Sequence, residues 1–238
     1  MPKTARKRKV LVIDVGGTNV KVLATGQTAR RRFPSGREMT PERMVAELKA
    51  VTKDWDFDVV SLGYPGPVKH GLPVSEPRNL GKGWVSFDFE EALECPVRIM
   101  NDAAMQALGS YKHGKMLFLG LGTGLGSSIV VHGTVRGLEL GTFPYRKKTI
   151  EDYVSRERLK SRGAKKWSKD VAVVVAHMIN ALHPDDVVLG GGNARKLTKI
   201  PKGCRLGSNA NAFIGGFRMW EEAEETQKSR TAPRTRAA

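Results

Sequence analysis

The sequence predicts an α/β protein built from two similar halves. Each half opens with an apolar run, a glycine-rich turn and a second apolar run, over residues 9–24 and 116–131. Short apolar runs that flank a glycine turn are typical of a β-hairpin. Helical and strand patterns follow each opening, so we predict a duplicated architecture with a ligand-binding cleft between the halves.

The first half contains one strongly marked helix, Pro41–Thr52. Its apolar residues, beginning with Met44 and Val45, recur at helical spacing, and Thr40 precedes it as an N-cap. The other expected elements are strands at Lys9–Val15, Val20–Ala24, Thr28–Arg32, Val59–Tyr64 and Val97–Met100, short helices at Phe87–Leu93 and Ala103–Leu108, and irregular loops over Val68–Ser86.

The second half repeats this organisation. Met116–Leu119 and Ser127–Val131 are predicted strands around the second glycine turn. The remaining expected elements are helices at Ile150–Lys160 and Ser168–Leu182, a strand at Asp186–Leu189 that stops at three glycines, and a closing helix at Asn209–Glu225. We expect an N-terminal lobe at residues 9–105, a C-terminal lobe at 106–225, and disordered basic tails at 1–8 and 226–238.

Positive charge is concentrated at the two ends of the chain. The net charge is +16, and residues 1–9 and 226–238 hold nine of the 40 basic residues and no acidic residue. The rest of the chain keeps 31 basic against 24 acidic residues. Such tails are either simply solvated or bind a polyanion, which would be a long phosphate polymer or, non-specifically, nucleic acid.

Several classes of protein are disfavoured. No apolar run is long enough for a membrane span and no secretory signal is visible, so we expect a cytoplasmic protein. Cys95 and Cys204 lie far apart without metal-ligand spacing, which favours reduced packing thiols. The five histidines have no ligand spacing either. Trp84 and Trp220 are interpreted as packing residues.

The first glycine turn is a candidate phosphate site. Gly16 and Gly17 let phosphate oxygens approach the backbone, whose N–H groups point into a small concavity. Thr18 can donate a hydroxyl hydrogen bond and Lys21 adds positive charge. Asp14 can hold Mg²⁺ directly or through water. The alternative is an ordinary hairpin turn.

The second glycine turn, Gly120–Ser127, is a candidate for the same role, with Thr123 as a donor. A dinucleotide fingerprint would need glycine at position 125 or 127, where leucine and serine stand. Gly109–Met116 resembles a P-loop, but Met116 replaces the serine or threonine that binds Mg²⁺. A hairpin-type phosphate turn or a merely flexible turn remains.

Asp102 is the candidate catalytic carboxylate. It follows a strand and opens a helix, which is also the position of a plain N-cap. As a general base it could take a proton from a substrate hydroxyl and steer that hydroxyl toward phosphorus. Asn79 and Asn101 could bind further hydroxyls of a polyol. Glu139, in a glycine-rich loop, is either a sugar ligand or a surface carboxylate.

The motifs in this order resemble the repressor/ORF/kinase (ROK) family of sugar kinases, within the actin–hexokinase–Hsp70 superfamily. The resemblance covers roughly residues 9–220 and rests on VLVIDVGGTNVKV, GYPGPV, NDA, FLGLGTGLGSSIV, LELG and PDDVVLGGG. The polyphosphate glucokinases are more similar still, since they also lack the family's zinc-binding cysteine cluster. The resemblance implies a two-lobed actin/hexokinase-like (ribonuclease H-like) α/β fold with a central cleft, a homodimer, and Mg²⁺ but no zinc.

The resemblance also assigns the phosphate contacts. Asp14 and Gly16-Gly17-Thr18 would form the first phosphate site, beside Mg²⁺, and Gly122-Thr123-Gly124 the second. Gly190-Gly191-Gly192 would lie where the base or ribose of a nucleotide binds in ATP users. The implied activity is transfer of a phosphoryl group from polyphosphate, ATP or both to a hexose, with glucose the first candidate and glucose 6-phosphate its product.

In this resemblance Asp102 is the catalytic base, and the sugar contacts are Asn79, Asn101 and Glu139. The chain departs from the family's Glu-x-Gly-His motif, because its histidine is replaced by Thr142 and the acidic residue that often follows falls at Pro144. The basic segment Thr142–Lys148 could favour an anionic donor or a modified sugar. A low-activity or non-catalytic sugar-binding protein is the alternative. A DNA-binding repressor is disfavoured, because only about eight residues precede the first strand.

Overall fold

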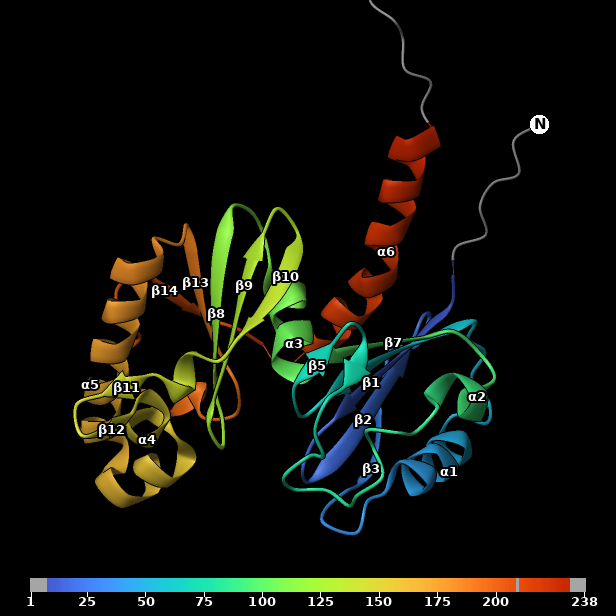
Figure 1. Cartoon of the computed structure of the whole chain (residues 1–238), viewed down its shortest axis with the longest axis horizontal. Coiled ribbons are helices and arrows are strands. Elements are labelled where there is room, and N and C mark those ends of the chain that lie inside the picture. The colour runs from blue at the N-terminus through green and yellow to red at the C-terminus, as the bar shows by residue number, and fades with distance from the viewer. Residues whose placement is uncertain (1–7, 209, 232–238) are drawn as a thin grey trace, which may run out of the picture. The chain divides into compact units, whose positions relative to one another are not determined.

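The structure is a computed structural model that describes residues 8–208 and 210–231 (Figure 1). It divides into two compact units. The first unit holds the described residues up to Met100 and those from Gly216 onward, and the second holds Asn101–Gly215. Within the described ranges, no helix combines the length and apolar character needed to cross a membrane.

The first unit is built on a five-stranded sheet of order β3-β2-β1-β4-β7. Its strands are β1 (Val10–Val15), β2 (Asn19–Ala24), β3 (Arg31–Pro34), β4 (Val59–Tyr64) and β7 (Val97–Asn101). β1 pairs antiparallel with β2 across the glycine turn, which confirms the predicted hairpin, and parallel with β4. The third strand begins at Arg31 and not at Thr28, because Gly26 takes a positive φ of 84° and the chain turns there first.

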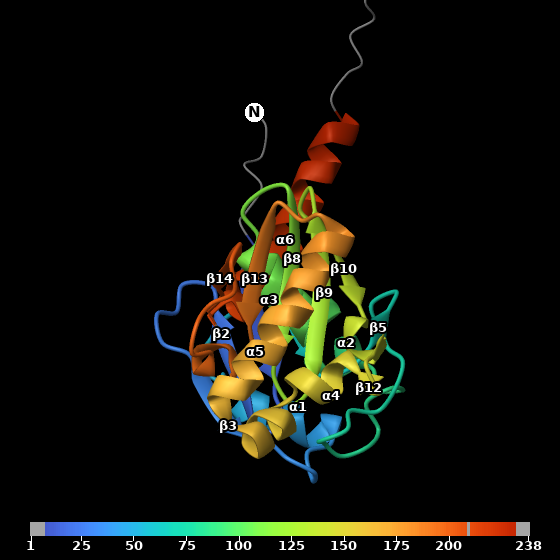
Figure 2. The same ribbon diagram turned by 90° about the vertical axis from the view of Figure 1, so that its left-hand side faces the viewer.

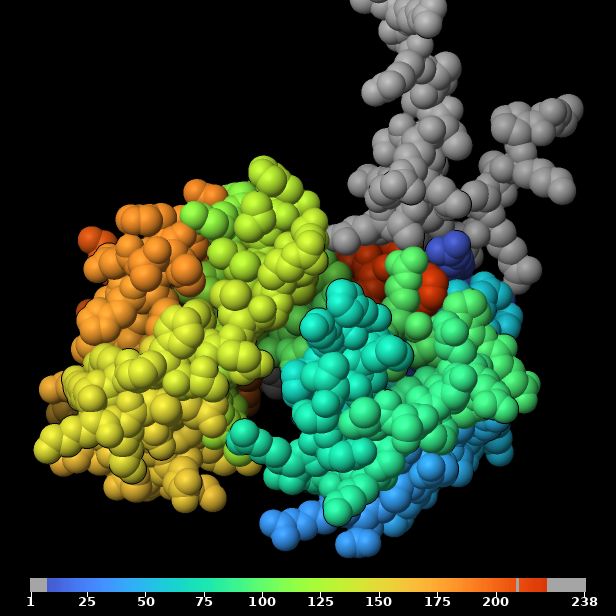
Figure 3. All heavy atoms as spheres, viewed as in Figure 1, coloured from blue at the N-terminus to red at the C-terminus, as the bar shows by residue number. Residues whose placement is uncertain are grey.

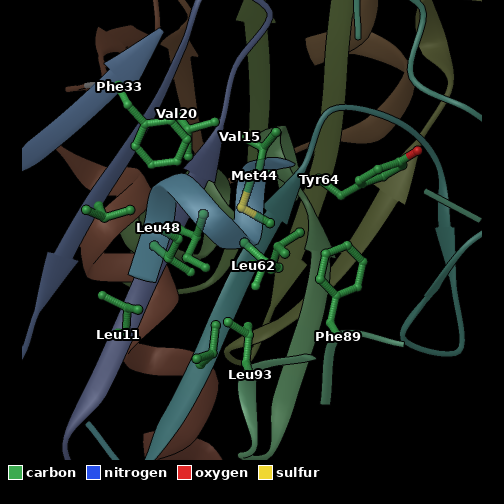
Figure 4. Packing of buried hydrophobic residues seen from close by; sticks show 14 of the residues in the cluster. Leu11, Val15, Val20, Phe33, Met44, Leu48, Leu62, Tyr64, Phe89 and Leu93 are labelled. Carbon is green, nitrogen blue, oxygen red and sulfur yellow. The ribbon is translucent and has the colours of Figure 1, made fainter. Parts of the chain in front are cut away.

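Helices cover both faces of this sheet. Alternate residues of β1 and β4, such as Leu11 and Leu62, pack against α1 (Pro41–Val51) and α2 (Phe89–Leu93) (Figure 4). Figure 4 shows Met44 and Leu48 of α1 among these side chains. As predicted, Thr40 caps α1 by accepting a hydrogen bond from the Arg43 N–H (3.4 Å). The region expected to be irregular contains a short hairpin of β5 (Val68–Lys69) and β6 (Leu72–Pro73).

The opposite face of the first sheet packs against α6 (Asn211–Thr231) from Gly216 onward. A Cβ at Gly216 would lie only 2.3 Å from Val12 Cγ1, so helix and strand are in close contact. The Ser61 hydroxyl donates to Gly216 O (2.6 Å) and accepts from Trp220 Nε1 (2.9 Å). Trp220 is 7% exposed, which confirms its prediction as a packing residue.

The second unit has a sheet of order β10-β9-β8-β13-β14. Its strands are β8 (Lys115–Leu121), β9 (Leu125–Val131), β10 (Thr134–Leu138), β13 (Asp186–Gly190) and β14 (Cys204–Leu206). β8 pairs antiparallel with β9 across the second glycine turn and parallel with β13. Both sheets thus place an antiparallel meander of three strands beside a parallel neighbour, and the predicted duplication of the hairpin openings is confirmed.

Two helices cover the faces of the second sheet (Figure 2). α5 (Arg156–Leu182) packs Trp167 and Val174 against β8 and β13, and α3 (Asp102–Ser110) packs Ala107 on the other side. Gly163 has non-helical angles (φ 73°, ψ 158°), so α5 is two helices joined at a kink. The shorter elements of this unit are η1 (Leu140–Thr142), β11 (Pro144–Tyr145), β12 (Lys148–Thr149), α4 (Ile150–Val154) and η2 (Ala194–Lys196).

The division into units differs from the predicted lobes at two places. Residues 101–105 belong to the second unit, because α3 packs on β9 and β10. The closing helix from Gly216 onward belongs to the first unit, through its contacts with Val12 and Ser61. α6 also runs to Thr231, so residues 226–231 are helical and not a disordered tail. The remaining predicted tail residues, 1–7 and 232–238, lie outside the described residues.

Candidate active site

The first glycine turn places Asp14 and Lys21 side by side. They are directly opposed on β1 and β2, and Lys21 Nζ lies 2.9 Å from Asp14 Oδ2. Their side chains are 34% and 17% exposed for Lys21 and Asp14, respectively. Lys21 therefore has a carboxylate partner within the hairpin, and a phosphate at this turn would share the ammonium with Asp14.

The turn itself is braced by Ser35, which follows β3. The Gly16 N–H donates to Asn19 O (3.1 Å), and the Ser35 N–H donates to Thr18 O (3.0 Å). The Ser35 hydroxyl donates to Gly16 O (2.5 Å). Gly17 and Thr18 are left exposed at the tip, where a ligand can reach them. Nothing in the sequence singled out Ser35, because its role depends on β3 lying beside β2.

Asn79 lies directly against this turn. A Cβ at Gly17 would be 3.2 Å from Asn79 Cβ, so a side chain at position 17 would displace Asn79. The Asn79 side chain is exposed, while the loop that carries it is anchored at Met39. Met39 O accepts from the Gly81 N–H (2.9 Å) and from Trp84 Nε1 (3.2 Å). The structure therefore brings a predicted sugar residue and a predicted phosphate turn together within the first unit.

Two aromatic residues, Trp84 and Tyr64, anchor the loop that carries Asn79. Trp84 is fully buried, which confirms its prediction as a packing residue, and its ring centroid lies 5.9 Å from that of Tyr64. The Tyr64 hydroxyl donates to Ser75 O (2.7 Å). Burial, and then the nearby Glu76 carboxylate, raise the pKa of Tyr64 to about 12. Tyr64 is thus a neutral hydrogen-bond donor over the ordinary pH range.

In the second unit, Asp102 occupies the first helical position of α3. The N-cap is Asn101, whose Oδ1 accepts from the Ala104 N–H (3.1 Å). The alternative interpretation of Asp102 as a plain N-cap is therefore wrong, because the preceding residue, Asn101, makes the capping hydrogen bond. Asp102 Oδ1 accepts from the Ala103 N–H (2.8 Å). The partial positive charge of a helix N-terminus favours an ionised carboxylate at this position.

The second glycine turn is held by bonds from two other elements. The Gly122 N–H donates to Gly124 O (3.0 Å) within the turn. Gly122 O accepts two hydrogen bonds, from the Arg156 N–H at the start of α5 (3.0 Å) and from Asn193 Nδ2 (2.9 Å). Asn193 is 4% exposed and follows the three glycines 190–192 at the end of β13. Thr123 is exposed at the tip, as a phosphate donor must be.

A carboxylate lies against the same turn. Glu151 Oε2 accepts a hydrogen bond from the Leu125 N–H (3.2 Å). A Cβ at Gly124 would lie 2.3 Å from this oxygen, and one at Gly141 would lie 3.2 Å from it. Glu151 therefore fills the space that two glycines leave open. Nothing in the sequence marks Glu151 as a site residue, since it stands in an expected helix without any motif around it.

The strand that leaves the second turn contacts the residue that follows Asp102. A Cβ at Gly126 would be 2.9 Å from Ala103 Cβ, so β9 and the first turn of α3 touch at the residue after Asp102. The second unit thus brings together the predicted base and one predicted phosphate turn. The first turn, with Asp14 and Asn79, belongs to the other unit.

The Glu139 loop is positioned by Ser127. The Ser127 hydroxyl donates to Leu138 O (2.8 Å) and accepts from the Leu140 N–H (3.1 Å). The Glu139 side chain is exposed. The hydroxyl of Thr142, which the resemblance places at the family histidine, donates to Glu139 O (2.7 Å) and so stabilises the loop.

The three glycines 190–192, of which Gly190 ends β13, have different surroundings. A Cβ at Gly190 would lie 2.3 Å from the Phe118 ring, and Gly191 takes a positive φ of 79° with Leu121 O only 2.5 Å from its would-be Cβ. These two glycines are needed for packing. Gly192 is exposed and has open space around it, so it is the glycine of the three that a nucleotide could reach.

Asp14 is the candidate metal ligand. Among the described residues, no group of three or more His, Cys, Asp or Glu side chains is arranged to hold a metal ion. Mg²⁺ is usually held by one or two carboxylates together with substrate phosphates and waters. A lone carboxylate beside a phosphate turn fits this coordination.

The fold and these features define a two-lobed α/β protein of the actin/hexokinase type. The chain belongs to the ROK family, whose model matches residues 10–143. It is 28% identical over 221 residues to the polyphosphate glucokinase of Mycobacterium tuberculosis (strain ATCC 25618 / H37Rv), with 83% of each chain covered. It is 29% identical over 137 residues to the glucokinase of Pyrobaculum calidifontis, covering 53% of this chain and 45% of the relative.

Solved structures show the same fold. The inorganic polyphosphate/ATP-glucomannokinase from Arthrobacter sp. strain KM superposes with a TM-score of 0.76 at 22% identity, covering 92% of this chain and 99% of that one. A ROK family glucokinase from Streptomyces griseus, in complex with glucose and AMPPNP, gives a TM-score of 0.71 at 15% identity, covering 90% and 99%.

Proposed function

We propose that the protein is a sugar kinase that transfers a phosphoryl group from polyphosphate, ATP or both to a hydroxyl group of a hexose. Glucose is the first candidate acceptor. The observation that carries the proposal is the position of Asp102 at the start of α3, where the following residue, Ala103, lies against Gly126 of β9, the strand that leaves the second glycine turn. A general base beside a phosphate turn is what phosphoryl transfer to a hydroxyl requires. The named relatives support the choice of donor and acceptor.

In this mechanism Asp102 accepts the proton of the sugar hydroxyl as the oxygen attacks the terminal phosphorus. The bond between that phosphorus and its bridging oxygen breaks, and the shortened donor leaves. Backbone N–H groups of Gly122-Thr123-Gly124 and of Gly16-Gly17-Thr18 bind the phosphates, with Lys21 adding charge. Asn79, Asn101 and Glu139 bind hydroxyls of the sugar, and Gly192 leaves room for a nucleotide.

Asp14 would hold Mg²⁺, directly or through water, with phosphate oxygens and waters as the other ligands. Bound there, the ion supplies positive charge to the phosphoryl oxygens. Lys21 Nζ, 2.9 Å from Asp14 Oδ2, keeps the carboxylate in place within the hairpin. A homodimer is the oligomeric state we propose from the family resemblance.

A second candidate is a sugar-binding protein of this family with little or no activity. The observation that favours it is Thr142, which replaces the family histidine and uses its hydroxyl on Glu139 O. Together with Pro144 in place of the acidic residue, Thr142 alters two sugar contacts of the family pattern. Direct titration with glucose by calorimetry distinguishes this candidate, since it predicts binding without turnover.

The decisive experiment measures phosphorylation of glucose by the purified protein with Mg²⁺, using ATP and polyphosphate in parallel. Asp102→Asn should lower kcat by at least about a hundredfold, because a general base contributes that much or more. Glu38→Gln, an exposed carboxylate outside the helices and strands, is the matched control and should keep full activity. Undiminished turnover in Asp102→Asn would refute the mechanism, and no turnover by the natural protein would favour the second candidate.

A further inference from the structure

A basic surface begins at the second glycine turn. α5 starts there, because the Arg156 N–H donates to Gly122 O (3.0 Å) and also approaches Thr123 O (3.4 Å). Six exposed cations then follow along α5. They are Arg156, Lys160, Arg162, Lys165, Lys166 and Lys169, which we call the α5 basic surface.

The acidic residues nearby leave this charge largely uncompensated. Residues 144–170 hold ten basic and four acidic residues. Three of the four acidic side chains are engaged elsewhere: Glu151 binds the glycine turn, Asp152 forms the capping box of α4, and Asp170 pairs with two arginines outside the α5 basic surface. Glu157 is the remaining one, so the surface keeps a strong positive charge.

The β11–β12 hairpin adds to this surface and is fixed to α5. Arg146 Nη1 lies 3.4 Å from Asp170 Oδ1, and its guanidinium stacks on Tyr145 and Tyr153. The two tyrosine rings meet edge to face at 5.1 Å. These contacts hold Lys147-Lys148 beside α5, and Figure 3 shows the hairpin and α4, in yellow, at the surface of the second unit.

The spacing of the cations on α5 is unfavourable for the helix when no anion is bound. Lys165 and Lys169 stand four residues apart on one helix face, and so do Arg156 and Lys160. Like charges at this spacing destabilise a helix. A bound polyanion would remove the penalty. The kink at Gly163 joins the two helical segments that carry these cations.

We propose that the α5 basic surface binds the part of an inorganic polyphosphate chain that extends beyond the glycine turns. This inference rests on the proposed function, since the reacting end of the donor would lie at Gly122-Thr123-Gly124. The chain would continue from there past Arg156 and along α5. Affinity for polyphosphate would then rise with chain length, whereas ATP, with only three phosphates, would gain nothing from the distal cations.

The chemistry of the surface favours polyphosphate over nucleic acid. Proteins that bind single strands combine cations with exposed aromatic rings on which bases stack. Here Trp167 is fully buried. Tyr145 and Tyr153 pack against each other and against the guanidinium groups of Arg146 and Arg158. Between Arg156 and Lys169, α5 exposes cations and no aromatic ring, and it begins at the second glycine turn.

The test uses the triple variant Lys165→Ala/Lys166→Ala/Lys169→Ala, which leaves the turn-proximal Arg156 intact. The matched control is Lys49→Ala/Lys53→Ala/Lys69→Ala, which removes the same charge from exposed positions of the first unit. For each protein, KM and kcat are measured with long-chain polyphosphate, short-chain polyphosphate and ATP. Binding of long-chain polyphosphate and of a single-stranded oligonucleotide is measured separately by calorimetry over a range of salt concentrations.

We expect the α5 variant to raise KM for long-chain polyphosphate at least tenfold, with kcat and KM for ATP unchanged. The slope of log affinity against log salt should fall by about two, for three lost cations. Equal KM and equal binding in both triple variants would overturn the inference while leaving the proposed function intact. If the natural protein turns over no donor, the proposed function fails, and calorimetry still decides whether polyphosphate binds on α5. An oligonucleotide that binds more tightly than polyphosphate and loses affinity in the α5 variant would reassign the surface to nucleic acid.

Discussion

Glu151 Oε2 accepts a hydrogen bond from the Leu125 N–H at 3.2 Å, across 26 positions of the chain. The carboxylate lies against Gly124 and Gly141, so it supports the second glycine turn and the Glu139 loop together. Both segments are expected to contact substrate. Glu151 is therefore a positioning residue, and its loss should impair the use of both the phosphoryl donor and the sugar.

We predict that Glu151→Ala lowers kcat/KM about tenfold or more, because the turn loses a charge-assisted hydrogen bond worth about 1.5–3 kcal/mol. Glu151→Gln keeps an oxygen acceptor at the same place and should lose less activity than Glu151→Ala, because a neutral hydrogen bond still contributes about 0.5–1.5 kcal/mol. The measurement is a kinetic comparison of the two variants with both donors. Equal loss in Gln and Ala would show that the charge matters and not the hydrogen bond, contrary to this prediction.

Ser35 should matter for the donor at the first turn. Ser35→Ala removes the hydrogen bond to Gly16 O, and a lost neutral hydrogen bond costs about 1 kcal/mol. We therefore expect the KM for the phosphoryl donor to rise about fivefold, with the KM for glucose unchanged. Thr28→Ala, in the exposed turn before β3, is the control. A Ser35→Ala variant with natural donor kinetics would mean that the turn holds its shape without this bond.

Within the second unit, the start of α6 packs closely against α3, and a substitution at Gly109 tests this contact. A Cβ at Gly109 of α3 would lie 1.8 Å from Asn211 O and 2.6 Å from the Gly215 nitrogen. Gly109→Ala should lower the free energy of unfolding by about 2 kcal/mol or more, because overfilled contacts force backbone shifts. Gly137→Ala is the control, since its Cβ would meet no atom within 4 Å. Denaturant unfolding of the two variants measures the difference, and equal midpoints would contradict the close contact.

The cysteines should be unreactive thiols in the native protein. Burial, and then Asp186, raise the pKa of Cys204 to about 11, and burial also raises the pKa of Cys95. At pH 8 the Cys204 thiolate is then about two hundredfold scarcer than in a free thiol of pKa about 8.5. Alkylation by iodoacetamide, followed by mass spectrometry, should be correspondingly slow until the protein is denatured.

The same shift predicts a pH dependence of stability. The unfolded chain loses the thiol proton near pH 8.5, whereas the folded chain keeps it to about pH 11. The contribution of Cys204 is therefore fully present below pH 8.5 and declines as the pH rises toward 11. Unfolding of Cys204→Ala should lack this part of the decline. Fast native alkylation at pH 8 would contradict both statements.

Much of the fold could be predicted because its signals are local. The two hairpins follow from apolar runs around Gly16-Gly17 and Gly120–Gly126, and the α1 cap follows from Thr40 directly before Pro41. The burial of Trp84 and Trp220 follows from their size and apolar character. Where two adjacent residues suited one role, the sequence did not decide between them. Asparagine and aspartate both suit the N-cap position. In the structure β7 ends at Asn101 and α3 begins at Asp102, so Asn101 is the N-cap.

By itself, the sequence determined the hairpin turns, the repeated plan of the two halves and the identity of Asp102 and Asp14 as candidate site residues, because each depends on neighbours within a few positions. Only the tertiary structure decided which residues support them. Ser35, Glu151 and Asn193 reach their turns from other elements, and α6 belongs to the second unit up to Gly215 and to the first unit from Gly216 onward. These contacts depend on the order of strands in each sheet and on which helix covers which face. That order is set by the packing of residues far apart in the chain, which leaves no local pattern to read.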